Sequence, residues 1–324
     1  MIIVLRPEIT REQAESLLAR IEGLGLKSLH MPGSERTVLG AIGDERVLAR
    51  LGLDGHPWVE SLKPILSPYK LVSRELHPHD TIVRLGPLAI GGRELAVVAG
   101  PALVESAEQL ETTATALQQS GAHAIFGGGF FRHTGPFRPP ELGASAYPLL
   151  AALRKSGGLP VLSAVAESND VERAQTELDG VLVESDDLAN GRLLAALGQS
   201  SIPVLLRRSP SADANSLLLA AEAVFNAGNE QVVLVEAGAT SLAAIPRLKH
   251  RSHLPVMAQP SPQPEWALAS SRAAVAAGAD GLFFYAHHDP AHAVGGSLAV
   301  APQQLRHLVR STTAVAEAVG RALP

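Results

Sequence analysis

From residue 95 to residue 324, eight short apolar runs alternate with eight amphipathic segments. Runs of four or five apolar residues are typical of parallel strands that are buried on both faces. We expect strands at 95–99, 123–126, 160–164, 180–183, 203–206, 232–236, 255–258 and 281–285, with a helix after each. Eight such units in about 230 residues predict an α/β fold, a (β/α)8 TIM barrel. An open doubly wound sheet is the alternative, but it would more often carry a phosphate-binding glycine fingerprint after its first strand.

The first 66 residues have a different order of elements. Strands are expected at 2–5, 26–31, 37–42 and 59–66, with helices at 10–25 and 44–51. This βαββαβ order predicts a small ferredoxin-like domain. We therefore expect three regions: a ferredoxin-like (ACT-like) domain over 1–66, a linker and capping hairpin over 67–94, and the barrel over 95–324. The order alone leaves open whether the first domain binds an effector or is a structural cap.

Composition excludes several classes of function. The chain has 46% hydrophobic and 18% charged residues and a formal net charge of −5, so we expect a well-packed protein that binds no nucleic acid. It contains no cysteine, which excludes disulfides and thiolate chemistry. No apolar stretch approaches the roughly 18–20 residues of a membrane span. Residues 1–7 resemble a strand more than a signal peptide, and we expect a cytoplasmic protein.

In a barrel of this kind, functional side chains lie on the loops that follow the strands. The first such loop reads Gly-Pro-Ala-Leu-Val-Glu-Ser at 100–106. This loop and seven further segments resemble the type I beta family of 3-deoxy-D-arabino-heptulosonate 7-phosphate (DAHP) synthases, in which a ferredoxin-like regulatory domain precedes the barrel. The further segments are 35–40, 68–75, 127–128 with Thr134, 228–230, 254–256, 260–261 and 277–282. Together they cover nearly the whole chain.

The resemblance implies a condensation of phosphoenolpyruvate with erythrose 4-phosphate that uses a divalent metal. The family's ligands are cysteine, histidine, glutamate and aspartate, and the corresponding positions here are Ala102, Pro262, Tyr285 and Gly296. Because these side chains offer almost no donor atoms, we expect no metal site of the family type and no other cofactor. His287 and His288 are an alternative pair, but neighbouring histidines at a strand end should point to opposite sides.

The family's phosphate-binding positions also differ. Cations after the second strand are replaced by Phe126 and Phe131, and the segment that follows is Arg132-His133-Thr134. An arginine after the fourth strand is replaced by Asp186. Arg207 and Arg208 keep their positive charge. The candidate pocket residues are Phe126, Phe131, Arg132, His133, Thr134, Asp186, Arg207, Arg208, Glu236, Tyr285 and His287.

Three interpretations of this remodelled site remain open. The acids and aromatics could bind a small aromatic molecule or an amine. The phenylalanines could instead fill the space that substrate and cations occupy in the family. Asp186 or Glu236 could act as a general base, with His133 as the acid.

For the function, we expect a DAHP synthase homologue that has lost metal-dependent condensation. It would act as a non-catalytic regulatory or scaffolding partner of another shikimate-pathway protein. The alternatives are a metal-independent enzyme with different chemistry on the same barrel, or a divergent active DAHP synthase. The resemblance also implies a homo-oligomer, either a dimer or a tetramer.

Overall fold

The computed structural model divides the chain into two compact units, Met1–Pro78 and His79–Pro324. It describes residues 1–32, 37–43, 45–64, 67–130, 141–156, 158–238 and 243–323. The expected linker and hairpin region, 67–94, is thus divided between the two units. Residues 67–78 belong to the first unit, and the antiparallel hairpin of β5 (Val83–Leu85) and β6 (Leu88–Ile90) belongs to the second.

The first unit is the expected ferredoxin-like domain. Its antiparallel sheet has the strand order β2-β3-β1-β4. The elements are β1 (Ile2–Leu5), α1 (Arg11–Gly23), β2 (Lys27–Pro32), β3 (Thr37–Ile42), α2 (Glu45–Leu48), the 3-10 turn η1 (Ala49–Leu51) and β4 (Val59–Lys63). Thr10 and Gln13 form a capping box at the start of α1, and Leu17 and Ile21 of that helix are buried in the core of the unit. Residues 35 and 36 of the family-like segment lie outside the described residues.

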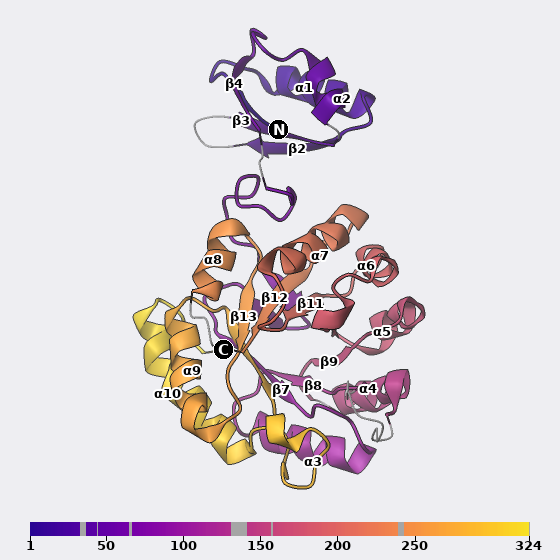
Figure 1. Ribbon diagram of the computed structural model, residues 1–324, viewed down its shortest axis with the longest axis vertical. Coiled ribbons are helices and arrows are strands. Elements are labelled where there is room, and N and C mark those ends of the chain that lie inside the picture. Colours follow the sequence, from indigo (N-terminus) through magenta and orange to yellow (C-terminus); the bar gives the residue numbers. More distant parts are fainter. Residues whose placement is uncertain are drawn as a thin grey trace. The chain divides into compact units, whose positions relative to one another are not determined.

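The second unit is a closed barrel of eight parallel strands, which confirms the predicted (β/α)8 architecture. Helices follow the strands and lie outside them (Figure 1). The strands are β7 (Ala96–Gly100), β8 (Ala124–Phe126), β9 (Val161–Ala164), β10 (Gly180–Val183), β11 (Val204–Arg208), β12 (Val232–Ala237), β13 (Val256–Gln259) and β14 (Gly281–Tyr285). The α-helices are α3 (Ala107–Gln118), α4 (Tyr147–Lys155), α5 (Val171–Glu177), α6 (Gly191–Gly198), α7 (Ala214–Ala227), α8 (Ala244–Arg251), α9 (Pro264–Ala276) and α10 (Pro302–Ala318).

The barrel strands differ from the prediction by one or two residues at their ends: five begin one residue later, and four end one or two residues later. β11 continues to Arg208, two residues beyond the expected end, because Arg208 lies opposite Glu236 of β12 and pairs with it. The predicted strand ended at residue 206, before the polar residues Arg207 and Arg208. Here they remain in the sheet, since each buried charge has a partner on the next strand.

Gly100 brings β7 and β8 close together at the carboxyl end of the barrel. A Cβ atom at this position would lie 1.7 Å from the carbonyl oxygen of Phe126, which no side chain tolerates. The close approach places Ala102, which follows β7, beside the end of β8.

No helix among the described residues is long and apolar enough to cross a membrane.

His123, which precedes β8, makes the stability of the barrel depend on pH. Its Nδ1 accepts a hydrogen bond from the backbone N–H of Val97 at 3.1 Å, and burial lowers the pKa of its imidazole below 6.5. Below pH 6.5 the unfolded chain therefore binds this proton more readily than the folded protein. We expect the free energy of unfolding to fall as the pH drops from 7.5 to 5.5, by at most about 1.4 kcal/mol per pH unit for this group.

Urea denaturation of the wild type and of His123→Gln at several pH values measures this dependence. Glutamine retains a hydrogen-bond acceptor but does not titrate, so the variant should lose less stability on acidification. His287, whose pKa is also lowered, contributes in the same direction, so the slope should shrink without vanishing. Identical slopes for the two proteins would contradict the assignment to His123.

Candidate functional site

A pocket of about 250 Å3 opens at the carboxyl ends of the barrel strands, and we call it the barrel-mouth pocket. Its walls come from the ends of β8, β9, β10, β11 and β14, from the loop after β7 and from the 3-10 turn η5 (Gly296–Leu298). The described lining residues are Ala102, Phe126, Phe130, Ala164, Val165, Ala166, Glu184, Ser185, Asp186, Asp187, Arg207, Ser209, Tyr285 and Leu298. Enzymes with this fold have their active sites at this end of the barrel.

Arg207 is the one lysine or arginine among the described lining residues. Its guanidinium lies 2.6 Å from Glu184 Oε2, and its Nη1 donates to Gln259 Oε1, also at 2.6 Å. The guanidinium carbon is 5.3 Å from the ring centroid of Tyr285. Burial disfavours the charged guanidinium, but Tyr285, Glu184 and Asp186 more than offset this effect and raise the pKa of Arg207. The charge is therefore permanent and held in one orientation.

Tyr285 forms the wall of the pocket beside this ion pair. Its hydroxyl donates to Glu184 Oε1 at 3.3 Å, and its ring is only 8% exposed. Burial, followed by the negative charge of Glu184, raises the pKa of Tyr285 well above its usual value. The phenol thus keeps its proton at neutral pH and remains a hydrogen-bond donor. Phe126 packs edge-on against Phe283 and tilted against Tyr285, so these three rings form one packed aromatic cluster.

Arg208 and Glu236 lie apart from the pocket. Arg208 Nε donates to Glu236 Oε2 at 2.8 Å, a second bond joins Nη2 to Oε1, and both residues are buried. Burial raises the pKa of Glu236, and the charge and hydrogen bonds of Arg208 oppose that rise. Neither residue belongs to the pocket lining, so the structure does not support Glu236 as the general base at this site.

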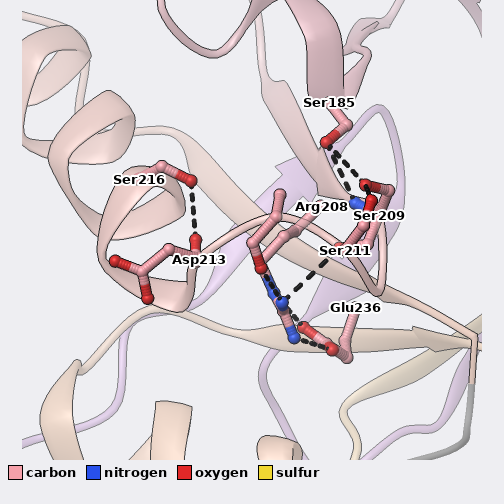
Figure 2. A network of polar contacts seen from close by, with 8 residues as sticks. Ser185, Arg208, Ser209, Ser211, Asp213, Ser216 and Glu236 are labelled. Carbon is pink, nitrogen blue, oxygen red and sulfur yellow. Dashed lines mark hydrogen bonds and ion pairs between the residues drawn. The ribbon is translucent and has the colours of Figure 1, made fainter.

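The same arginine fastens the loop that follows β11. Its guanidinium donates to the carbonyl oxygen of Ser209 (Figure 2) and also to that of Ala212. The hydroxyl of Ser185, which follows β10, accepts a hydrogen bond from the backbone N–H of Ser209 at 3.1 Å. Ser185 and Ser209 line the barrel-mouth pocket. This network therefore fixes the position of the pocket wall between β10 and β11.

The histidine pair after β14 does not have the expected arrangement. The rings of His287 and His288 stack with centroids 4.4 Å apart and planes inclined by 30°, so they do not point to opposite sides. The expectation was wrong because β14 ends at Tyr285, and alternation along a strand does not extend into the loop. His288 Nδ1 bonds the Thr113 hydroxyl at 2.7 Å, and His287 Nδ1 accepts the Asp289 N–H at 2.9 Å. His287 does not line the pocket.

The structure brings four of the predicted site residues together: Phe126, Asp186, Arg207 and Tyr285 line one pocket. Phe131, Arg132, His133 and Thr134 lie outside the described residues. Sequence reasoning missed Gln259 and Leu298. Gln259 ends β13 in the same layer as Arg207, and this position at the carboxyl end of a strand is the signal that could have found it.

The positions of the family's metal ligands do not form a donor set. Ala102 and Tyr285 line the barrel-mouth pocket, Pro262 lines a neighbouring cavity and Gly296 lies in η5. A methyl group, a proline ring, a glycine and a protonated phenol do not fit a divalent transition metal. In the described part of the chain, no group of three or more His, Cys, Asp or Glu side chains could hold a metal ion.

Comparisons with known proteins cover both units. The DAHP synthase ferredoxin-like domain matches residues 1–67, and the DAHP synthetase I family matches residues 80–318. A phospho-2-dehydro-3-deoxyheptonate aldolase of Thermotoga maritima is 32% identical, over 99% of this chain and 99% of the relative. A 2-dehydro-3-deoxyphosphooctonate aldolase of Koribacter versatilis is 28% identical over 71% of this chain and 94% of the relative. The crystal structure of the Thermotoga maritima phospho-2-dehydro-3-deoxyheptonate aldolase (DAHP synthase) superposes with a TM-score of 0.75 and 32% identity, covering 100% of this chain and 98% of that one.

These comparisons overturn one prediction. The chain was expected to be a non-catalytic regulatory or scaffolding partner, but a relative named as an aldolase matches it from end to end at 32% identity. The prediction was wrong because it gave four altered ligand positions more weight than the retained length, domain order and strand-end loops. The comparison favours the alternative, a divergent member of the synthase family, over a non-catalytic partner.

Proposed function

This chain belongs to the DAHP synthetase I family, and from that membership we propose that it is an active carbon–carbon bond-forming enzyme of the aldolase class. The observation that carries the proposal is the end-to-end similarity to a relative named as an aldolase. The barrel-mouth pocket, at the end of the barrel where this fold performs its chemistry, would be the active site.

The reaction proposed first is the one that the relative's name and the family resemblance imply, the condensation of phosphoenolpyruvate with an aldose phosphate. Arg207 would attract the anionic substrates, since guanidinium groups suit phosphate and carboxylate oxygens. C3 of phosphoenolpyruvate bonds to the aldehyde carbon of the aldose, whose oxygen gains negative charge and then a proton. Water adds at C2 of the former enol phosphate, and inorganic phosphate leaves to give the keto product. Tyr285 keeps its proton and would redirect the hydrogen bond that it now gives to Glu184 toward the carbonyl oxygen of the aldose.

A divalent metal would polarise the same carbonyl oxygen in the family reaction. The side chains at Ala102, Pro262, Tyr285 and Gly296 do not fit such an ion, so we assign no step to it. In this proposal Arg207 and Tyr285 stabilise the negative charge on the aldose oxygen, which the metal stabilises in the family reaction. Effector binding by the first unit and homo-oligomer formation remain predictions.

A second candidate is the same class of reaction on substrates with less negative charge. Among the described lining residues, the carboxylates of Glu184, Asp186 and Asp187 are present with one guanidinium, that of Arg207. Two unit charges 4 Å apart interact by about 4 kcal/mol at an effective dielectric constant of 20. This excess of negative charge favours an unphosphorylated carbonyl compound over an aldose phosphate.

One assay with four substrate pairs tests both candidates. Purified protein is incubated with phosphoenolpyruvate or pyruvate, each combined with erythrose 4-phosphate or erythrose, in manganese and separately in EDTA. The first candidate predicts condensation of the phosphorylated pair with equal rates in manganese and EDTA. The second predicts a higher kcat/KM with erythrose than with erythrose 4-phosphate. No product from any pair would contradict both, and turnover in manganese alone would contradict the role given to Arg207 and Tyr285.

A further inference from the structure

A second cavity, of about 630 Å3, lies next to the barrel-mouth pocket, and we call it the α9 cavity. Its volume is within the range of roughly 300–1,000 Å3 that small-molecule sites occupy. Its walls come from the segments that follow β11, β12 and β13, from one face of α9 and from η5. The proposed reaction does not use this space.

The walls of the α9 cavity are apolar and aromatic. The rings of Pro210, Pro260 and Pro262 line it together with the large apolar side chains of Trp266 and Leu298. Trp266 is 61% exposed and Leu298 43% exposed, so two large exposed apolar side chains occur together at one cavity. An exposed indole ring offers a flat surface on which another ring can stack.

The polar groups of the cavity are all uncharged. No described lining residue is Asp, Glu, Lys, Arg or His. A charged ligand would therefore lose hydration without gaining an opposite charge, which is costly. The backbone N–H of Ser261 donates to Ser270 Oγ at 3.2 Å, and that of Gln263 donates to Ser261 Oγ at 3.3 Å. These bonds hold the loop after β13 against α9, so the cavity is already formed without a ligand.

From this lining we infer that the α9 cavity is a binding site for an uncharged small molecule with an aromatic ring. The site adjoins the barrel-mouth pocket through one shared residue and one hydrogen bond. Leu298 lines both cavities, and Gln259, which lines the α9 cavity, accepts the hydrogen bond from Arg207. Binding is measured directly, so the inference does not depend on the proposed reaction.

The two tryptophans of the chain provide the measurement. Trp266 lies at the cavity, and Trp58 lies in the first unit. The full-length protein is labelled with 5-fluorotryptophan, and Trp58→Phe assigns the two 19F resonances. The probes are p-cresol as an uncharged aromatic, benzoate and benzylamine as charged aromatics, and cyclohexanol as an uncharged aliphatic. We expect p-cresol to shift the Trp266 resonance saturably and the other three to bind at least tenfold more weakly, with the Trp58 resonance unchanged.

Matched variants on α9 locate the site. Ala269 lines the cavity and Ala276, also exposed, does not. Ala269→Phe should fill the cavity and weaken p-cresol binding at least tenfold, whereas Ala276→Phe should leave it unchanged. Ala273 also lines the cavity, and Ala273→Phe replaces Ala269→Phe in this test if the latter does not fold. The inference is overturned if no saturable shift occurs, if benzoate or benzylamine binds as well as p-cresol, or if the resonance follows protein concentration, which would indicate contact with a second copy of the chain.

Discussion

Replacement of Asp280 by alanine is expected to lower the free energy of unfolding of the barrel unit by about 3–5 kcal/mol. The Asp280 carboxylate is fully buried immediately before β14. It accepts Lys249 Nζ at 2.8 and 2.9 Å, the guanidinium of Arg321, and the backbone N–H of Val256 at 2.7 Å. It therefore joins α8, the C-terminal segment and β13 at one point. Removing it takes a charged acceptor from two cations and the side-chain acceptor from a buried N–H group.

Equilibrium urea denaturation, followed by circular dichroism, measures this loss. Asp280→Asn keeps the shape and one acceptor oxygen, so its loss should be intermediate. Asp289→Ala is the control: this exposed carboxylate pairs with His292 at the surface, and its removal should leave the denaturation midpoint unchanged. A loss below about 1 kcal/mol for Asp280→Ala would show that the network contributes little, as for a surface ion pair.

Replacement of Arg207 by methionine is expected to reduce kcat/KM of the condensation by about 100–1,000-fold. Arg207 supplies the positive charge of the barrel-mouth pocket, and methionine retains much of its length without the charge. The loss should be largest for phosphorylated substrates. Arg207→Lys keeps the charge but not the planar fork that binds Glu184 and Gln259 together, so its loss should be smaller.

Steady-state kinetics with the best pair from the four-substrate assay measures the effect of Arg207→Met. Arg192→Met, at an exposed position on α6, is the matched control and should retain full activity. Circular dichroism separates a loss of chemistry from a loss of fold. A kcat/KM within threefold of the wild type would exclude Arg207 from the reaction.

The barrel could be predicted from the sequence because its strands are buried on both faces. Runs such as 180–183 and 281–285 contain apolar residues and glycine without a polar interruption, and both match β10 and β14 residue for residue. The carboxyl ends were harder to predict. A polar residue after an apolar run can belong to the strand or to the loop. It stays in the strand where the neighbouring strand offers it a partner. Arg208 stays in β11 because Glu236 of β12 neutralises it.

The contents of the site were predictable only in part. At Ala102, Pro262 and Gly296 no side-chain atom can bind a metal, and this holds in any fold. Which charges face the pocket depends on direction as well as identity. Arg207 and Arg208 are neighbours in the chain, but one lines the barrel-mouth pocket and the other forms a buried ion pair. Successive side chains of a strand point to opposite faces, so the extension of β11 to Arg208 separates them.

The sequence by itself therefore determined the architecture and the chemical nature of each candidate side chain. Its periodicity reflects which faces are buried, and its family-like segments identify the chain's relatives. The tertiary structure alone decided which side chains meet. Gln259 with Arg207, Glu184 with Tyr285 and Thr113 with His288 are contacts between segments that are far apart in the chain. A buried polar group needs a hydrogen-bonding partner, and which group becomes the partner depends on position in space rather than on position in the chain.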